Sequence, residues 1–225
     1  MLPLQPHSSC MKFSAKELEV LYLDNHLLAI NKPATLLTQA THLDGCSLEV
    51  LAKAWLGDKL KKRGNIYLHP IHRLDKPVSG IILFARTGKA LSRLHAQVRG
   101  RLIKKTYFAQ IEGELTPRSG VLKHALIHGD HRAHHSPSGG KEAILSYTVC
   151  RVYSTYSSLV KIVPHTGRYH QIRAQLSLIG HPILGDRKYG SKRKSSRIHL
   201  HHAQMSFTHP VALDRLTITS VIPFM

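Results

Sequence analysis

Residues 69–86, HPIHRLDKPVSGIILFAR, place one carboxylate among several bases and then continue into an apolar segment. The acid is Asp75, and Arg73 and Lys76 are its nearest basic neighbours in the sequence. An acid in this setting is either half of a surface salt bridge or an ionised carboxylate that acts as a nucleophile or a base. The spacing alone favours the salt bridge, and the nucleophile stays an open alternative.

A second stretch, residues 164–190, carries an arginine that could complement this acid. Arg173 lies within a predicted helix in PHTGRYHQIRAQLSLIGHPILGDRKYG, so its guanidinium projects to one side at a defined height. If the fold brings Arg173 to Asp75, the ion pair would keep the carboxylate ionised in a partly dry pocket. These two residues are the first candidates for a reactive centre.

The charge of the chain indicates the kind of partner. The 225 residues include 32 Lys and Arg against 13 Asp and Glu, a formal net charge of +19. This excess is typical of proteins that bind a polyanion, and no apolar run approaches the roughly 20 residues of a membrane-spanning helix. Nucleic acid is therefore the expected partner, and a membrane is not. Aromatic residues make up only 6% of the chain, which favours shape-and-phosphate recognition of structured RNA over stacking on long single strands.

Histidine is abundant, with 18 copies, and the clusters HGDHRAHH (128–135) and HLHH (199–202) raise the question of a metal site. Neither cluster contains H-E-x-x-H or the paired Cys and His spacing typical of zinc. We interpret them as polar or RNA-facing histidines and predict no metal.

The cysteines, Cys10, Cys46 and Cys150, form no C-x-x-C pair, and the N-terminal residues lack the apolar core of a secretory signal. Both features favour a reducing, cytoplasmic location.

The spacing of apolar residues predicts the elements that must position these side chains. Helices are predicted over 47–59, 87–100 and 168–182. Strands are predicted at two segments within 19–33, joined by a turn at Asp24 and Asn25, and at 80–85, 104–113, 143–153, 157–164, 200–207 and 216–222. The order lacks strict βαβ repetition, which predicts an α+β fold with a mixed, mostly antiparallel central sheet flanked by helices and loops. Residues 128–141 and 190–197 are predicted surface loops, residues 1–17 an N-terminal arm, and residues 18–225 one domain.

Five segments together resemble the RluA-type pseudouridine synthases, in the family's order and over about Leu27 to Phe224. They are AINKPATLL (29–37), HRLDKPVSGIILFAR (72–86), KKTYFAQIEG (104–113), HTGRYHQIRAQLSLIGHPILGDRKYG (165–190) and LHHAQMSFTHP (200–210). The resemblance implies the pseudouridine synthase catalytic fold and the isomerisation of specific uridines in structured rRNA or tRNA after base flipping. It implies no cofactor and no required protein partner, and we expect a monomer.

The resemblance also implies roles for individual residues. Asp75 matches the catalytic carboxylate, Arg73 the arginine that takes the place of the flipped nucleotide, and Tyr107 the tyrosine that packs on the target base. Arg173 matches the arginine that pairs with the catalytic carboxylate. Further basic side chains are expected to bind RNA: His72, Lys76, Lys104, Lys105, Arg168, His170, Lys188, Lys192, Arg193 and Lys194. Covalent addition of Asp75 to the uracil ring or sugar and a glycal route, in which Asp75 removes a sugar proton, both fit the sequence.

Three positions depart from the family pattern. Val78 and Tyr169 stand where threonine is usual, and Thr35 stands where glycine is usual. None of them is a reacting group, so we expect effects on loop geometry and target choice.

Many relatives carry a small RNA-binding domain before the catalytic one, whereas only a short arm precedes Leu27, so the basic catalytic domain is expected to hold the RNA. Two alternatives stay open: an RNA-binding protein of this fold without turnover, and a metal-dependent nuclease that uses the histidine clusters.

Overall fold

The computed structural model describes residues 13–42, 44–62, 64–154 and 156–224. The chain divides into two compact units. Unit 1 is Met1–Ile103 with Ser206–Ser220, and unit 2 is Lys104–Met205 with Val221–Met225. Each unit combines helices with antiparallel strands, which confirms the predicted α+β class. Most of the predicted arm lies outside the described residues, and Ala15–Glu17 at its end forms a short 3-10 helix. The single domain expected over 18–225 stays a prediction, and each unit is described by itself.

Unit 1 is built on antiparallel strands in the order β1-β2-β4, with β3 paired to β4 and β11 paired to β10. Their bounds are β1 Val20–Leu23, β2 Leu27–Lys32, β3 His69–Pro70, β4 Ser79–Ala85, β10 Leu200–Thr208 and β11 Arg215–Thr219. Every residue of β4 is buried, as the unbroken apolar run predicts for a strand covered on both faces. The division between the units falls within β10, after Met205.

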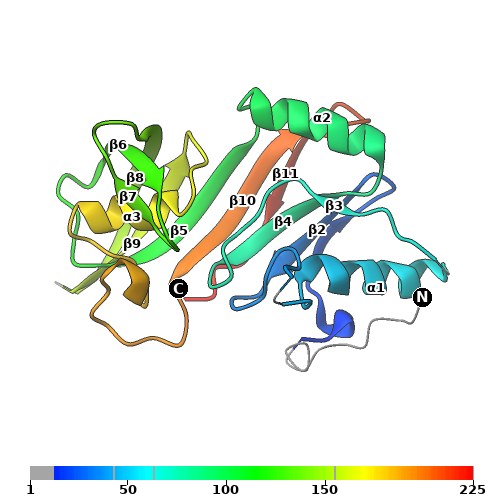
Figure 1. The fold of residues 1–225 in the computed structure, drawn as a ribbon, viewed down its shortest axis with the longest axis horizontal. Coiled ribbons are helices and arrows are strands. Elements are labelled where there is room, and N and C mark those ends of the chain that lie inside the picture. Colours follow the sequence, from blue (N-terminus) through cyan, green and yellow to red (C-terminus); the bar gives the residue numbers. More distant parts are fainter. Residues whose placement is uncertain (1–12, 43, 63, 155, 225) are drawn as a thin grey trace. The chain divides into compact units, whose positions relative to one another are not determined.

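Two helices of unit 1 begin at side-chain caps. In α1, Leu48–Leu60, the Ser47 hydroxyl accepts from the Val50 N–H, and in α2, Gly88–Arg99, the Thr87 hydroxyl accepts from the Ala90 N–H. Each bond satisfies one of the four N–H groups that a helix start leaves unpaired. The predictions for these two helices, 47–59 and 87–100, were correct to within one residue at each end. In Figure 1, α1 and α2 lie on separate sides of β4, against which α2 packs.

Unit 2 is a sheet in the order β10-β5-β9-β8-β6-β7, in which the strands from β5 to β7 pair antiparallel. Its strands are β5 Lys104–Glu112, β6 Ser119–His128, β7 Ala133–His135, β8 Lys141–Ser154 and β9 Ser157–Pro164, followed by the first residues of β10. Strand β6 was not predicted. The prediction of an uninterrupted loop over 128–141 was also wrong, because residues 133–135 form β7 and pair with the end of β6. A three-residue strand is too short to show an alternating pattern.

Helix α3, Gln171–Leu178, is shorter than the predicted 168–182 and packs against β6 and β7 (Figure 1). It begins only after His170, whose backbone is left-handed at φ 52° and therefore lies outside the helix. Beyond its C-terminal end, Gly180 is left-handed at φ 81°, which agrees with the predicted sharp stop. A 3-10 turn, η3 Arg187–Tyr189, follows and contacts α3. No helix in the described part of the chain is long and apolar enough to cross a membrane.

Candidate functional site

Asp75 lies in the loop of unit 1 that joins β3 to β4, and the backbone on either side of it is fixed. The Leu74 N–H donates to the Thr38 hydroxyl at 3.2 Å, and that hydroxyl donates to the Leu74 carbonyl at 3.1 Å. After Asp75, the Val78 N–H donates to the Asp75 carbonyl at 3.0 Å and closes a turn. Leu74 and Val78 are buried, Asp75 is half-buried, and Arg73 is exposed. The backbone at Asp75 is thus fixed by hydrogen bonds on both sides, and the neighbouring Arg73 side chain is exposed.

A buried lysine that the sequence analysis did not single out organises the same loop. The Lys32 side chain is fully buried, and its ammonium donates to the carbonyls of Pro33, Leu36 and Lys76 at 3.0, 2.8 and 3.2 Å. Burial, the larger effect, lowers the pKa of Lys32 to about 7, while the negative charge of Asp75 acts to raise it. Lys32 therefore ties the segment after β2 to the residue that follows Asp75. The only signal in the sequence was its place in AINKPATLL.

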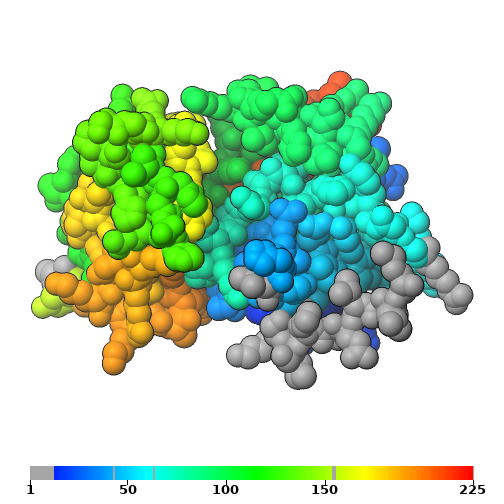
Figure 2. All heavy atoms as spheres, viewed as in Figure 1, coloured from blue at the N-terminus to red at the C-terminus, as the bar shows by residue number. Residues whose placement is uncertain are grey.

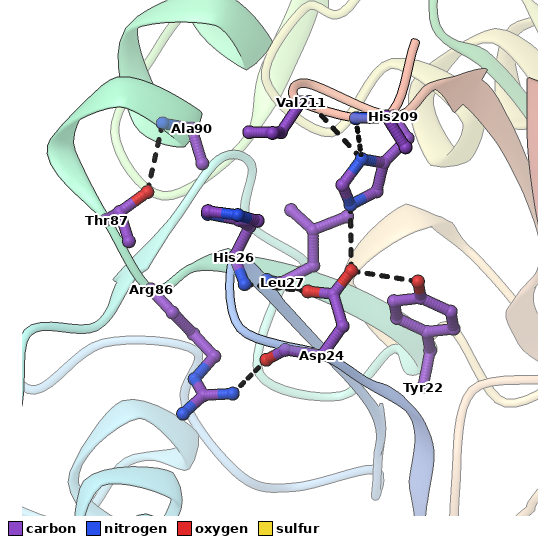
Figure 3. A network of polar contacts seen from close by, with 10 residues as sticks. Tyr22, Asp24, His26, Leu27, Arg86, Thr87, Ala90, His209 and Val211 are labelled. Atoms are coloured by element: carbon purple, nitrogen blue, oxygen red, sulfur yellow. Dashed lines mark hydrogen bonds and ion pairs between the residues drawn. The ribbon is translucent and has the colours of Figure 1, made fainter. Parts of the chain in front are cut away.

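A second polar network in unit 1 contains a histidine and an aspartate in contact, an arrangement that catalytic pairs also use (Figure 3). Nε2 of His209 lies 2.8 Å from Oδ2 of Asp24, and the ring's other nitrogen, Nδ1, accepts from the N–H groups of Val211 and Ala212 at 3.2 and 2.8 Å. Both ring nitrogens are thus engaged. Asp24 also accepts from the Tyr22 hydroxyl. The His209 ring has no lone pair left to serve as a base, so this network is structural.

Tyr107, the candidate base-packing residue, lies on β5 in unit 2. Its ring stacks on His202 with centroids 4.5 Å apart and planes 17° from parallel. Tyr107 is 8% exposed and His202 is fully buried. Side chains two residues apart share a face of a strand, so Lys105 lies on the same face as Tyr107. Burial lowers the pKa of Lys105 to about 8, and within the described ranges its ammonium has no hydrogen-bond or ion-pair partner.

Arg173 lies on α3 in unit 2 and is only 4% exposed. Its Nε and Nη2 donate to the two carboxylate oxygens of Asp186 at 2.6 and 2.9 Å, and its guanidinium lies 5.0 Å from the centroid of the Tyr189 ring. Asp186, which is fully buried, was not identified from the sequence. A bidentate pair with a second contact on an aromatic face fixes the guanidinium. Asp75 belongs to unit 1, and its predicted pairing with Arg173 stays a prediction.

The predicted RNA-binding residues fall into two groups. Seven are exposed: Lys76, Lys104, Arg168, Lys188, Lys192, Arg193 and Lys194. The basic loop 190–197 contains three of them and forms part of the orange surface of unit 2 in Figure 2. The others, His72, Lys105 and His170, are half-buried or buried. The His72 ring accepts from the Leu83 N–H, and Nδ1 of His170 bonds the Tyr189 hydroxyl at 2.9 Å.

The three departures from the family pattern have distinct structural settings. Thr35 is exposed and left-handed, with φ 73°. Val78 is buried, so a methyl replaces a hydroxyl that would need a partner there. Tyr169 is 40% exposed and stacks on His170 with centroids 3.8 Å apart, while its ring lies 4.2 Å from that of His128.

Among the described residues, no group of three or more His, Cys, Asp or Glu side chains is arranged to hold a metal ion. The two histidine clusters instead make hydrogen bonds and ring contacts. His135 bonds the Ala125 carbonyl through Nδ1, and His202 stacks on Tyr107.

The chain is similar to known proteins over most of its length. Residues 26–178 match a family described as RNA pseudouridylate synthase. The chain is 32% identical to tRNA pseudouridine synthase C of Pasteurella multocida, covering 89% of this chain and 90% of that protein. It is 34% identical to the dual-specificity RNA pseudouridine synthase RluA of the same organism, covering 90% and 92%. The solved structure of human RNA Pseudouridylate Synthase Domain Containing 4 matches with a TM-score of 0.79 at 25% identity, covering 93% of this chain and 91% of that one. The matched family range includes Asp75, Tyr107 and Arg173.

Proposed function

Because the chain belongs to the RNA pseudouridylate synthase family and is therefore an isomerase, we propose that it converts specific uridines in structured tRNA or rRNA into pseudouridine. The observation that carries the proposal is the family match over residues 26–178, which contains HRLDKPVSG with Asp75 in a rigid loop. The net charge of +19 supports a polyanionic substrate. One similar protein is named a tRNA pseudouridine synthase and another a dual-specificity RNA pseudouridine synthase. These names support tRNA or rRNA as the substrate class.

The reaction breaks the bond from the ribose to the uracil nitrogen, turns the ring and rejoins it through carbon. No group is lost and no electrons are transferred overall, so the chemistry needs no cofactor. We propose Asp75 as the catalytic carboxylate, acting either by covalent addition or by removing a sugar proton on the way to a glycal. Its half-buried position keeps it accessible, and the turn closed by Val78 fixes its backbone.

The other three candidates have settings that suit their proposed roles. A uridine stacked in a helix hides its reacting bond, so it must be flipped at a cost of a few kcal/mol. The exposed Arg73 side chain can enter the helix and replace the flipped base. The Tyr107 ring, backed by His202, presents a fixed aromatic surface for uracil, and Arg173 is a fixed cation for the catalytic carboxylate.

The exposed basic residues are proposed to hold the RNA backbone through phosphate contacts. We further propose that the chain acts in the cytoplasm as a monomer, without a protein partner. The catalytically silent alternative is disfavoured because Asp75, Tyr107 and Arg173 are all present. A metal-dependent nuclease would be inhibited by a chelator and would shorten its substrate, neither of which we expect.

The test of the proposal is Asp75→Asn, assayed by nucleoside analysis of tRNA and rRNA after incubation with the purified protein. The wild type should form pseudouridine, and the variant should lose it by at least about 10³-fold because the amide can neither add covalently nor accept a proton at neutral pH. The matched control is Asp58→Asn, at an exposed position on α1, which should keep wild-type activity. Undiminished activity of Asp75→Asn would refute the catalytic assignment. RNA binding by a wild type that forms no pseudouridine would instead support the silent alternative.

A further inference from the structure

The histidine-rich segment 128–135 has no role in the chemistry proposed above, and its residues 132–135 line a pocket in unit 2. The pocket has a volume of about 320 Å³ and lies between β7, the C-terminal half of α3, and η3. Its polar lining includes Arg132, His134, His135, Lys188 and Ser177, and the Tyr189 side chain also lines it.

The charges in the pocket have one sign. Arg132 and Lys188 are cations, His134 and His135 add imidazole side chains, and no Asp or Glu lines the pocket. Asp186, the buried carboxylate that precedes η3, is already paired with Arg173. An uncompensated cluster of this kind attracts an anion, and a volume of this size holds a phosphate with part of its attached sugar.

Hydrogen bonds hold the walls of the pocket in place. The buried Tyr189 hydroxyl accepts from the Ala133 N–H at 2.7 Å and bonds Nδ1 of His170 at 2.9 Å, which joins β7 to η3 and to the start of α3. The Lys188 ammonium donates to the His131 carbonyl at 2.9 Å, and the Ser177 hydroxyl donates to the Tyr189 carbonyl at 2.7 Å. The basic groups are therefore presented by a preorganised frame, which reduces the entropic cost of binding.

We infer that this pocket binds a phosphodiester of the RNA substrate through Arg132, His134 and His135, which assigns a definite ligand to a cluster that the sequence indicates only as polar or RNA-facing. The inference rests on the proposed function, because it takes RNA as the ligand. The Tyr189 ring lines the pocket and also lies beneath the Arg173 guanidinium, so RNA bound here contacts a residue that supports a proposed catalytic group. The histidine-rich segment thereby gains a role in substrate binding without a metal.

The test compares two double variants of unit 2 that each remove two exposed positive charges. Arg132→Gln with Lys188→Gln alters the pocket, and Arg151→Gln with Lys123→Gln alters exposed positions on β8 and β6 outside it. Binding of a fluorescently labelled tRNA is measured by anisotropy between 50 and 300 mM salt. The pocket variant should bind at least about 10-fold more weakly, and the slope of log affinity against log salt should fall by about 1, as expected for one lost phosphate contact. The control variant should change affinity less than about 2-fold.

His134→Gln serves as a second variant because it leaves the hydrogen bond from Lys188 to the His131 carbonyl intact. It should also weaken RNA binding. Equal losses in the pocket and control doubles, or no loss in the pocket double, would overturn the inference. Calorimetry with inorganic phosphate distinguishes an RNA phosphodiester from a free phosphate ion as the ligand. If phosphate binding depends on Arg132 while RNA affinity does not change in the pocket variant, the pocket binds a free anion. That result would also overturn the inference. Because anisotropy needs no turnover, a failure of this inference is distinct from a failure of the Asp75→Asn assay.

Discussion

The backbone φ angle of Thr35 shows that this departure from the family pattern costs conformational strain. Thr35 has φ 73°, in the left-handed region, where a β-branched residue is strained and glycine is not. The family's usual residue at this position is glycine, so the structure gives a physical reason for the pattern. Thr35 N–H donates to the Lys76 carbonyl at 2.8 Å, which holds the strained residue beside the candidate catalytic loop.

Thr35→Gly should therefore stabilise the protein, by about 1 kcal/mol in the free energy of unfolding, because relief of the left-handed strain exceeds the extra entropy of glycine in the unfolded chain. Urea unfolding followed by circular dichroism measures the difference. Thr35→Ala is the matched control, since it keeps the Cβ and most of the strain and should gain much less. A destabilised glycine variant would show that the hydroxyl of Thr35 contributes more than its backbone costs.

Several residues of the candidate site could be predicted from sequence, and others could not. Asp75, Arg73, Tyr107 and Arg173 stand in motifs whose order is readable along the chain. The contacts of Lys32, His202 and Asp186 are tertiary: Lys32 bonds the carbonyl of Lys76, which is 44 positions away. A lysine in a sequence is an ordinary surface residue by default, and only the fold shows that it is buried among three carbonyls.

At the scale of elements, the turn between β1 and β2 is fixed by the network in Figure 3. Asp24 accepts from the N–H groups of His26 and Leu27 at 2.7 and 2.6 Å, from Tyr22, and from His209 in the turn between β10 and β11. Burial acts to raise the pKa of Asp24, but these hydrogen bonds together lower it below its ordinary value. The ionised carboxylate thus joins two turns that are distant in sequence.

Asp24→Asn should destabilise the protein by about 1 to 2 kcal/mol at pH 7, a value reduced for partial exposure of the carboxylate. The lowered pKa means that the folded state favours the ionised form. The stabilisation is therefore fully present above the unfolded-state pKa near 4 and is lost as the pH falls through the lower folded-state pKa. Urea unfolding at pH 7, 4 and 3 should show the difference between wild type and variant shrinking as the pH falls. A difference that grows with acid would contradict the role of the ionised carboxylate.

The starts of α1 and α2 were predictable because their signals are local: Ser47 and Thr87 each cap the helix that follows within three residues. The start of α3 has no side-chain cap, and it lies three residues after the predicted one. Strand β6 was missed because its sequence, SGVLKHALIH, lacks strict alternation, and its exposed face includes Val121 and Ile127. Its register is set by β8, with which it pairs from Ser119 to Leu126. A strand that is specified by its partner more than by its own pattern is not visible in a single sequence.

At the scale of the whole molecule, the net charge supports the proposed way of holding RNA. A net charge of +19 on 225 residues, with few aromatic residues, favours binding dominated by phosphate contacts. Composition alone predicts phosphate-dominated binding, because the net charge is a sum over the residues and does not depend on the fold. Which basic residues can contact RNA depends on their exposure. His170 was among the residues predicted from the sequence, but it is buried and hydrogen-bonded to the Tyr189 hydroxyl.

RNA affinity should consequently fall by about 10³-fold between 50 and 200 mM salt if six or more phosphates are contacted. The exposed loop residues Lys192, Arg193 and Lys194 are expected to supply part of this dependence. Replacing all three by glutamine should lower the slope of log affinity against log salt by about 2 to 3, since each phosphate contact contributes roughly 0.9. Filter binding with tRNA across the salt series measures both slopes.

A scattered triple variant, Lys16→Gln with Lys89→Gln and Lys123→Gln, removes the same charge from exposed positions in both units and is the matched control. Long-range attraction between a protein and RNA is screened beyond about 10 Å at 0.1 M salt, so charges outside the contact surface should affect the slope little. If both triples lower the slope equally, the total charge matters and the loop has no special role. If the loop triple alone lowers it, the loop contacts phosphates directly, and a flat response of the wild type would contradict phosphate-dominated binding altogether.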